Sequence, residues 1–524
     1  GDLLSSKEVG SCLTEFTYDS FHRPIMSNSN GKTRHTTYTP KGLISSTTDT
    51  FGNTIQYQYD AFNRCILTIF PKVLDENGDP YHPTMECKYD LHGNTTYCKN
   101  AKGEEKRSYY NILSKPTHEI FPDGSEIRNF YDTKGNLIQT IDQEGSETFF
   151  SYDGFGQMIL KKGPLFEESW NYSPLKLLSY TDQTGLTTTF EYDSYGRKTI
   201  ENRQGRKTEF TYDKFNLLES VISETIVTTE THDVEGKIIK KSECGENLTL
   251  YDYDSENRIK NVRKITSIGE SIDRVAYDDS GKIISHIDPL GATTQFLYKP
   301  LEKITIDPLH NLTIERYDPL ERLIEIEKKD ADGITVFREK NFYDRSGNFA
   351  RKISYIYQNG TFIKQSEILW EYDFRGLVIK EELLDKTTLN EYDTLGRLIK
   401  RTLPNGITLK HSYDQANRLT HLESSDGTIN YSYKYGLGLN PILIEDHIHA
   451  TRLQREYNLF GELIREINDQ NLSLSWEYDL LGRKTSLTLP DQSKITYLHE
   501  SNHMKKIERL SSNGTPLYSH TYDE

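Results

Sequence analysis

Hydrophobic and polar residues alternate along much of the chain, in short runs that end at a Tyr-Asp pair. In Phe190-Glu191-Tyr192 an aromatic residue stands at every second position, with a polar residue between. Successive side chains of a β-strand point to opposite faces, so this pattern predicts strands with their aromatic residues on one face. No segment of helix length shows a convincing 3.6-residue period. The slot two residues before the tyrosine also holds Phe16, Phe150, Phe210, Trp170, Trp370 and Trp476. Thr211 and Glu371 should point away from this aromatic face, like Glu191, whereas Phe210 and Tyr372 belong to it.

The Tyr-Asp pair is the core of an internal repeat. Clear copies read YDSYGRK from Tyr192, YDTLGRL from Tyr392 and YDLLGRK from Tyr478. They recur about every 20 to 21 residues where the repeat is well kept, and degenerate copies such as YNLFGEL from Tyr457 continue the period. The repeat therefore covers nearly the whole chain, without a composition change that would separate domains.

Each repeat contains two turn signals. Asp-x-x-Gly follows the motif tyrosine, as in 193–196, and we name this the YD turn. A second Asp-x-x-Gly, as in 142–145 and 182–185, lies about halfway to the next tyrosine, and we name it the half-repeat turn. Asp at the first position and Gly at the fourth is the chemistry of a type I turn, and the YD turn resembles a hairpin loop with a glycine bulge. Each repeat is thus predicted to hold two short strands.

A residue that recurs at every turn is expected to serve the turn, so the motif side chains are predicted to be structural and not catalytic. No catalytic, cofactor-binding or metal-binding residue is predicted. The structural motif positions are Tyr192, Asp193, Gly196, Arg197, Tyr392, Asp393, Gly396, Arg397, Tyr478, Asp479, Gly482 and Arg483.

About 25 repeats of two strands give roughly fifty strands in meander order, and an open twisted sheet seldom exceeds about 10 strands before it curls or splits. A spiral sheet that walls a cavity and a set of β-propellers both satisfy this limit. A propeller should show a period near 40 to 45 residues, whereas neighbouring hairpins here are alike, which favours the spiral. We therefore expect an all-β fold of tandem antiparallel β-hairpin repeats, in a long sheet spiralling into a hollow shell or an arc of one. Residues 1–524 should form a single segment of this shell.

Composition supports a thin wall. Hydrophobic residues make up 35% of the 524 residues and the mean hydropathy is -0.70, which is lean for a solid core. The net charge of -16 argues against nucleic acid and anionic membranes as partners. No apolar run approaches the length of about 18 residues that a membrane span needs.

The motif YDxxGR, with its preceding aromatic-x-Tyr and interposed Asp-x-x-Gly, is similar to the YD repeats of Rhs proteins. Related repeats occur in the B and C components of insecticidal Tc complexes and in animal teneurins. The resemblance implies a hollow β-shell that encloses a C-terminal toxin in bacterial members, where Asp residues of a core region release the toxin by self-cleavage. In teneurins it implies a role in cell-surface adhesion.

The resemblance implies a non-enzymatic shell segment without cofactors, secreted or at the cell surface. Its partners would be its own C-terminal effector region or components of a secretion system or toxin complex. The sequence ends within a motif at Tyr522 and shows no glycine-rich core or toxin domain, so we expect a fragment to which self-cleavage is not transferred. The alternative is a surface adhesion or carbohydrate-binding protein, whose stacked aromatic side chains would face sugars.

Two segments are candidate chemical sites. Asp288-Pro289, Asp307-Pro308 and Asp318-Pro319 resemble the paired Asp-Pro elements of the self-cleaving core, but Asp288 lies in register with the half-repeat turns, so a turn is the better interpretation. In Asp446-His447-Ile448-His449 the two histidines would share one face of a strand and could bind a metal. A strand without metal is the better interpretation here, because no further ligand is identifiable.

Three gaps between motif tyrosines exceed one repeat and predict extended hairpins or loops: residues 59–89, 317–343 and 343–372. The Pro/Gly/Asp-rich stretch 74–83 in the first gap should lie on a surface. Cys87 and Cys98 flank a YD turn at matching distances and should face each other across the hairpin, with a disulfide only in an oxidising compartment. Most of the cysteines, which also include Cys12, Cys65 and Cys244, are expected to be free thiols.

Overall fold

The computed structural model describes residues 5–6, 14–29, 32–245, 247–358, 360–501 and 503–522. Every regular element in these ranges is a β-strand, as the alternating pattern predicts. Throughout them there is also no helix with the length and hydropathy of a membrane span.

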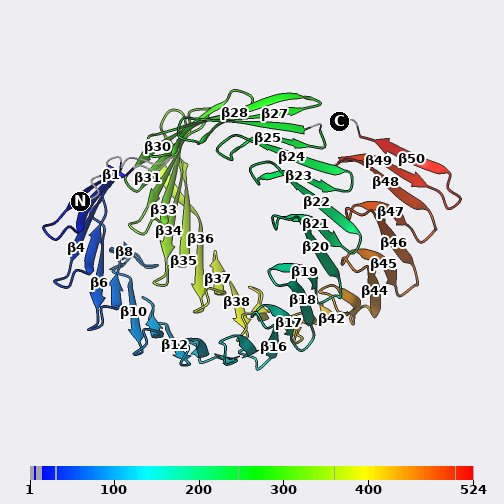
Figure 1. The fold of residues 1–524 in the computed structure, drawn as a ribbon, viewed down its shortest axis with the longest axis horizontal. Helices are drawn as coiled ribbons and strands as arrows, with labels where there is room; N and C mark the ends of the chain where they lie inside the picture. The colour runs from blue at the N-terminus through cyan, green and yellow to red at the C-terminus, as the bar shows by residue number, and fades with distance from the viewer. Residues whose placement is uncertain are drawn as a thin grey trace. The chain divides into compact units, whose positions relative to one another are not determined.

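The strands are short and follow one another in chain order (Figure 1). The first are β1 (Ser5–Ser6), β2 (Thr14–Tyr18), β3 (Pro24–Ser29), β4 (Lys32–Tyr38), β5 (Ile44–Thr48), β6 (Thr54–Tyr59), β7 (Cys65–Ile69), β8 (Val73–Leu74), β9 (Pro80–Tyr81), β10 (Thr84–Tyr89), β11 (Thr95–Lys99), β12 (Glu105–Tyr110), β13 (Pro116–Ile120), β14 (Glu126–Tyr131), β15 (Leu137–Ile141), β16 (Glu147–Tyr152) and β17 (Met158–Lys162). The next are β18 (Glu167–Ser173), β19 (Lys176–Thr181), β20 (Thr187–Tyr192), β21 (Lys198–Arg203), β22 (Arg206–Tyr212), β23 (Leu218–Ser223), β24 (Ile226–His232), β25 (Ile238–Glu243), β26 (Asn247–Tyr253), β27 (Ile259–Thr266), β28 (Gly269–Tyr277), β29 (Ile283–Ile287), β30 (Thr293–Lys299), β31 (Glu302–Ile306), β32 (Leu312–Tyr317), β33 (Leu323–Lys329) and β34 (Thr335–Tyr343). The last are β35 (Phe349–Gln358), β36 (Thr361–Tyr372), β37 (Val378–Leu383), β38 (Lys386–Tyr392), β39 (Leu398–Thr402), β40 (Thr408–Tyr413), β41 (Leu419–Ser424), β42 (Asn430–Tyr435), β43 (Pro441–Asp446), β44 (Thr451–Tyr457), β45 (Leu463–Asn468), β46 (Ser473–Tyr478), β47 (Lys484–Thr488), β48 (Lys494–Glu500), β49 (His503–Leu510) and β50 (Pro516–Thr521).

Strands pair antiparallel with their neighbours in the chain. Within the described ranges 48 strands belong to one sheet, and β8 and β9 form a separate hairpin between the paired strands β7 and β10. In most YD hairpins the register shifts by one residue just before the motif tyrosine, as between Glu191 and Tyr192. This shift is the bulge that the motif predicts, and it changes the direction of the tyrosine side chain relative to the regularly paired strand residues.

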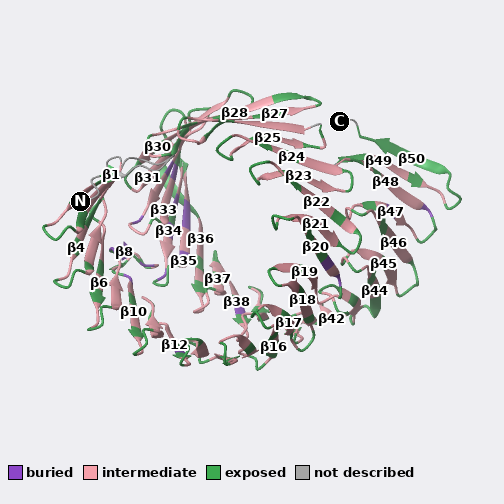
Figure 2. Cartoon of the chain, in the orientation of Figure 1, coloured by how far each residue is buried: buried purple, intermediate pink, exposed green. Residues whose placement is uncertain are grey.

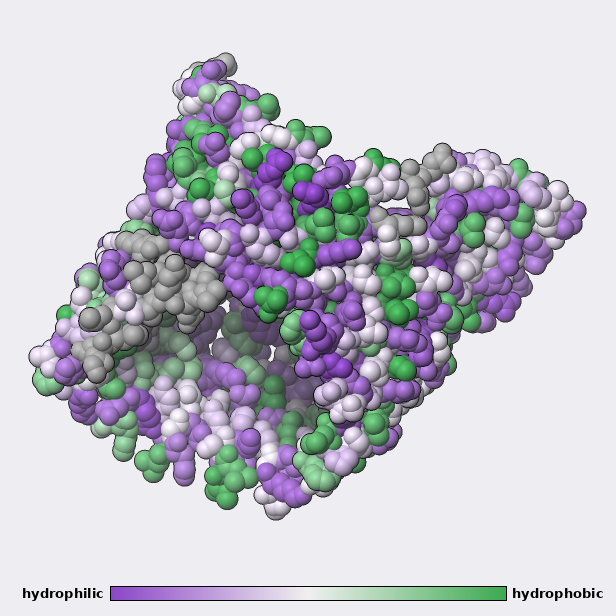
Figure 3. Space-filling view, turned by 45° about the horizontal axis from the view of Figure 1, so that its top comes forward, coloured by the Kyte–Doolittle hydropathy of each residue, from purple (hydrophilic) through white to green (hydrophobic). Residues whose placement is uncertain are grey.

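The sheet has a thin core. In β20 the side chains of Phe190 and Tyr192 are half-buried and Glu191 is exposed, which confirms the predicted alternation. Most strand residues fall in the same half-buried range, and few are buried (Figure 2). Hydrophilic and hydrophobic residues are mixed over the face shown in Figure 3. Stability must therefore come from many shallow contacts rather than from one central core. Among the described residues, the buried hydrophobic ones are Val73, Leu186, Ile314, Ala350 and Ile353.

The chain divides into two compact units, each made of stretches that are distant in sequence. Unit 1 consists of residues 1–128, which we name its early stretch, residues 272–390, which we name its late stretch, and the short segment 252–262. Unit 2 contains an early stretch, residues 129–251, a late stretch, residues 391–524, and residues 263–271. We describe each unit by itself.

The irregular gaps are extended hairpins, as predicted. The first gap holds the β8–β9 hairpin, and the third is formed by β35 and β36, of 10 and 12 residues. The prediction that stretch 74–83 lies on a surface is wrong at Asp75, which is only 1% exposed, and at Pro83, which is also buried. Asp75 is covered because its hairpin packs on the late stretch of unit 1, a contact that local composition does not reveal.

Candidate functional site

The YD turn is closed by its aspartate. Asp193 Oδ1 accepts hydrogen bonds from the backbone N–H groups of Tyr195 (2.9 Å) and Arg197 (3.0 Å), and Asp193 Oδ2 accepts one from Arg197 Nε at 2.7 Å. The N–H of Gly196 donates to the Asp193 carbonyl at 3.0 Å, and the glycine has a φ of +87°. The carboxylate thus pairs two turn donors and one guanidinium, which is the chemistry of an Asx turn with an added ion pair.

Two other well-kept motifs have the same geometry. Asp393 Oδ1 accepts the N–H groups of Leu395 and Arg397 at 3.0 and 2.9 Å, and Arg397 Nε lies 2.5 Å from Asp393 Oδ2. Asp479 accepts the N–H of Arg483 at 2.9 Å and its Nε at 2.7 Å. The glycines Gly396 and Gly482 have φ values of +85° and +80°.

The turn contacts lower the pKa values of two of the motif carboxyls, Asp193 and Asp479. Burial pushes the pKa of Asp193 up, but the hydrogen bonds and the positive charge of Arg197 outweigh it, so the pKa lies below its ordinary value of 3.8. The pKa of Asp479 is lowered for the same balance of reasons, with Arg483 as the partner. These groups are stable carboxylates at neutral pH and not acids poised for proton transfer.

The motif tyrosine connects its hairpin to the preceding one. The Tyr192 hydroxyl donates to the carbonyl of Leu177 at 2.8 Å, and the Tyr478 hydroxyl donates to the carbonyl of Leu463 at 2.9 Å. A phenylalanine could fill the same space but could not make this bond. The same bond joins Tyr38 to Pro24, Tyr59 to Ile44, Tyr110 to Thr95, Tyr152 to Leu137, Tyr212 to Lys198, Tyr277 to Ile259, Tyr343 to Leu323, Tyr413 to Leu398 and Tyr435 to Leu419.

The motif arginine connects its hairpin to the following one. The guanidinium of Arg197 lies over the ring of Tyr212 at 4.6 Å, and its Nη1 donates to Asn216 Oδ1 at 2.9 Å. Arg397 lies 5.2 Å from the ring of Tyr413. Sequence reasoning missed this role, although an arginine recurring after the turn glycine was its visible signal. The same stacking occurs for Arg23 on Tyr38, Arg64 on Tyr89, Arg258 on Tyr277, Arg322 on Tyr343 and Arg418 on Tyr435.

In unit 1 the late stretch docks on the early stretch through turns. Arg345, in a YD turn, pairs with Asp75 at 3.1 Å, and the Asp75 side chain is 2% exposed. Burial raises the pKa of Asp75, but backbone N–H groups and Arg345 outweigh burial and hold it below its ordinary value. The Lys102 ammonium, in a half-repeat turn, donates to the carbonyl of Tyr372 at 3.0 Å. Phe374 also packs against Phe121, with ring centres 6.3 Å apart.

A cleft of about 560 Å³ lies along this contact, lined by Phe70, Met85, Phe121 and Phe374 among others. Its cationic side chains have carboxylate partners. Arg375, for example, pairs with Asp373 at 2.7 Å, and Lys106 pairs with Glu119 at 2.7 Å. The cleft is apolar with neutralised charges at its rim, which gives it no selectivity for an anionic ligand.

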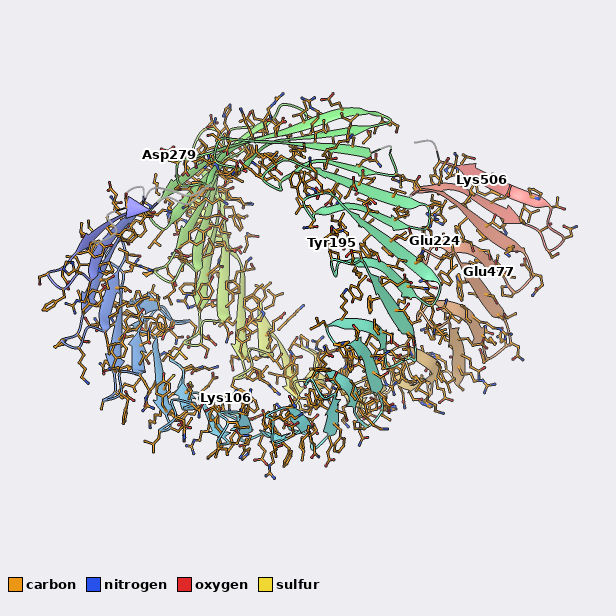
Figure 4. All side chains as sticks on the ribbon, in the orientation of Figure 1. Lys106, Tyr195, Glu224, Asp279, Glu477 and Lys506 are labelled. Atoms are coloured by element: carbon orange, nitrogen blue, oxygen red, sulfur yellow. The ribbon has the colours of Figure 1, made fainter. Side chains whose placement is uncertain are left out.

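Unit 2 has a matching contact between its own stretches. Arg206, beside a half-repeat turn, donates from Nη2 to both oxygens of Glu462 at 2.8 Å, and its guanidinium lies 3.6 Å from the ring of Phe460. The Thr394 hydroxyl, in another YD turn, donates to Glu144 in a half-repeat turn. In each unit, therefore, YD turns of the late stretch contact half-repeat turns of the early stretch. Tyr195 and Glu224, at the two kinds of turn, lie at opposite ends of neighbouring hairpins of unit 2 (Figure 4).

The two candidate chemical sites form turns. Asp288 Oδ1 accepts the N–H groups of Leu290 and Ala292 at 2.9 and 2.8 Å, which supports the turn interpretation. The expectation of a strand at His447 and His449 is wrong, because β43 ends at Asp446 and both histidines lie in a turn. His449 Nδ1 lies 2.7 Å from Asp446 Oδ2 and His447 Nε2 lies 2.9 Å from Ser432 Oγ. The part of the chain that the structure describes holds no cluster of three or more potential metal ligands.

Cys87 and Cys98 face each other across their hairpin, as predicted. They are register partners, and their Sγ atoms are 3.1 Å apart. Burial and the contact with Cys98 raise the pKa of the Cys87 thiol to about 12, so it is not a reactive thiolate. Cys65 and Cys244 are free thiols, and Cys12 lies outside the described residues.

The repeat geometry agrees with sequence profiles of known families. A profile of the teneurin YD-shell matches residues 76–524, and a profile of the RHS repeat matches residues 38–69. The chain belongs to the teneurin YD-shell family. The YD-shell is a structural shell domain, which agrees with a motif whose polar groups are engaged in turns and neighbouring hairpins. A search among curated proteins finds no match to this sequence.

Solved structures of Tc toxin complexes align with this YD-shell chain at low identity. The TcdB2-TccC3 complex aligns over 97% of this chain and 38% of its own, with 12% identity and a TM-score of 0.43. The same complex without its hypervariable C-terminal region aligns over 98% of this chain and 31% of its own, with 13% identity and a TM-score of 0.47. A Tc holotoxin pore from Photorhabdus luminescens aligns over 96% of this chain and 27% of its own, with 15% identity and a TM-score of 0.36. The chain thus spans well under half the length of these proteins.

Proposed function

We propose that residues 1–524 are one structural segment of a YD-repeat shell that encloses a C-terminal toxin or effector polypeptide for delivery. The observation that carries the proposal is that the sheet is connected in two ways, between neighbouring hairpins and between stretches distant in sequence. Tyrosine hydroxyls and arginine side chains join each hairpin to its neighbours, and turns join stretches that are about 250 residues apart, as with Arg206 and Glu462. Such a wall needs no solid core.

The proposed segment is not an enzyme and needs no cofactor. The carboxylates of the motif are engaged by turn N–H groups and arginine, so they contribute to turn stability and not to proton transfer. Its partners would be its own effector region or components of a secretion system or toxin complex, and it would act outside the cell or at its surface. The family membership supports this location and these partners.

Adhesion or carbohydrate binding is the alternative. It requires aromatic faces and hydroxyl groups that are available to a ligand. Residues of the aromatic face such as Phe190 and Tyr192 are half-buried, and the Tyr192 hydroxyl donates a hydrogen bond to a backbone carbonyl. These contacts favour the shell over a sugar platform.

Protease protection tests the proposal. An unfolded polypeptide with a protease site, fused after Glu524, should be cleaved at least about tenfold more slowly than the same polypeptide fused to an unrelated folded carrier, because a wall restricts access. The motif variant Tyr192→Phe with Arg197→Ala, which loosens neighbouring hairpins, should restore part of the cleavage. Equal cleavage of the two fusions would reject enclosure, and specific binding to a glycan array would favour adhesion.

A further inference from the structure

The YD turns in the early stretch of unit 2 carry a row of exposed apolar side chains. The exposed fractions are 76% for Phe155, 90% for Leu175, 80% for Tyr195, 50% for Phe215 and 88% for Val234. These residues stand at the tips of successive YD-side hairpin turns, so they form one continuous edge. We name this row the early YD edge. A row of this kind is typical of a contact surface, whereas single exposed apolar residues are ordinary.

The third position of the YD turn, which Phe155, Tyr195 and Phe215 occupy in the early stretch, is half-buried in three turns of the late stretch of unit 2. The second position stays exposed there, at Leu459 (51%) and Leu480 (52%). Leu395, Phe460 and Leu481 are half-buried, and Phe460 packs under the guanidinium of Arg206 at 3.6 Å. The covering surface is the row of half-repeat turns of the early stretch. The repeat thus has a known mode of association, in which YD tips dock on half-repeat turns.

The half-repeat turns in the late stretch of unit 2 are the complementary free edge. Leu186, directly after an early half-repeat turn, is 1% exposed, whereas Leu472, directly after a late one, is 47% exposed. Ile448, at another late half-repeat turn, is 44% exposed, and Asp426 and Asp491 lie in further exposed turns of this row. We name this row the late half-repeat edge.

We propose that the early YD edge of one chain binds the late half-repeat edge of a second copy of this chain. Both edges belong to unit 2, and both are built from the repeat that already joins the two stretches within that unit. Successive turns along either edge are two strands apart, so the spacing of tips and turns matches in the same way as in the internal contact.

The proposed contact is head-to-tail, because the two edges differ. Each bound copy leaves one edge of each kind free, so association should continue beyond the dimer. This property separates the proposal from a two-fold dimer, in which one surface meets itself.

Sedimentation velocity over a range of protein concentrations tests self-association. The average mass of the full chain should rise with concentration beyond that of a dimer. The triple variant Phe155→Ser, Leu175→Ser, Tyr195→Ser should weaken association about tenfold or more, since it removes three apolar contacts at exposed tips. A control variant, Phe149→Ser with Ile442→Ser and Leu498→Ser, removes part-exposed apolar side chains from strands and should associate like the parent. Far-UV circular dichroism should show that all three proteins are folded.

A mixing experiment tests the head-to-tail geometry. The variant Ile448→Glu, Leu472→Glu places charge on the late half-repeat edge and should not self-associate. Mixed with the triple Ser variant, it should form a one-to-one complex and nothing larger, because each partner keeps one intact edge. A parent chain that stays monomeric at all concentrations, a triple Ser variant that associates normally, or a mixture without the one-to-one complex would each overturn the proposal.

Discussion

Leu186 and Leu472 show how one local structure acquires two environments. Each leucine directly follows a half-repeat turn, and the N–H of each donates to a capping side chain, Asp182 Oδ1 at 3.1 Å and Asn468 Oδ1 at 2.9 Å. Yet Leu186 is 1% exposed and Leu472 is 47% exposed. The difference arises because the early half-repeat turns of unit 2 lie under late YD turns, whereas Leu472 stays exposed at its late half-repeat turn. Turn chemistry is therefore local, and burial depends on the adjacent layer of sheet.

In the YD turns of unit 2 the difference in exposure is reversed, with the early residue exposed and the late residue covered. Tyr195 in the early stretch is 80% exposed, and Phe460 in the late stretch is half-buried on Arg206. The two comparisons together place the internal contact between early half-repeat turns and late YD turns. Variants at paired positions can test this assignment.

The largest difference is expected between Leu186→Ala and Leu472→Ala. The first removes a fully buried side chain and should lower the free energy of unfolding by about 2 to 5 kcal/mol. The second acts on a part-exposed side chain and should change it by no more than about 0.5 kcal/mol. Urea unfolding followed by tryptophan fluorescence measures both. Similar losses for the two variants would contradict the assignment of the covered edge.

Arg206→Ala should produce the next largest effect. It removes a partly buried ion pair and the stacking on Phe460, so we expect a loss of about 1 to 3 kcal/mol. Arg206→Lys keeps the charge but loses the planar two-bond contact, so it should recover only part of the loss. Full stability of the Ala variant would show that the ion pair does not hold the two stretches together.

Glycine substitution in a YD turn should have a similar cost in either stretch, because the turn is local. At Gly396, with a φ of +85°, valine should cost about 1 to 2 kcal/mol. Asparagine should cost much less, because Asn63 and Asn216 occupy the same turn position with a φ of +67°. Equal unfolding midpoints for Gly396→Val and the parent chain would refute the turn assignment.

Acid should destabilise early and late YD turns alike, with a small effect for each carboxyl. The folded pKa values of Asp193 and Asp479 lie below the ordinary value of 3.8. Their contribution is therefore fully present above the unfolded pKa of about 3.9 and is lost as pH falls through the lower folded values. Circular dichroism should show unfolding beginning below about pH 4. Loss of stability that starts above pH 5, or a fold unchanged at pH 2, would contradict this.

Local order was readable from the sequence, and the contacts between layers were not. The alternation around Glu191, the turn at Asp193 and the pairing of Cys87 with Cys98 follow from short-range periodicity, and the structure agrees. The contact between Arg206 and Glu462 joins residues 256 positions apart and leaves no local pattern. The burial of Asp75 was missed for the same reason.

The strand expected at His447 failed for a different reason. Two histidines separated by one residue fit a strand, but Asp446 caps the following backbone N–H groups and begins a turn. A single sequence favours neither over so short a segment, because an aspartate can end a strand as well as continue it.

Hydroxyl-radical footprinting of the tip residues tests the central claim most directly, since it measures side-chain exposure in solution. At a dilution where the chain is monomeric, Phe155 and Tyr195 should be oxidised several-fold faster than Phe460, after correction for the intrinsic reactivity of each side chain. Arg206→Ala should raise the oxidation of Phe460 and leave that of Tyr195 unchanged. Equal corrected rates for Tyr195 and Phe460 in the parent chain would contradict the claim that late YD turns dock on early half-repeat turns.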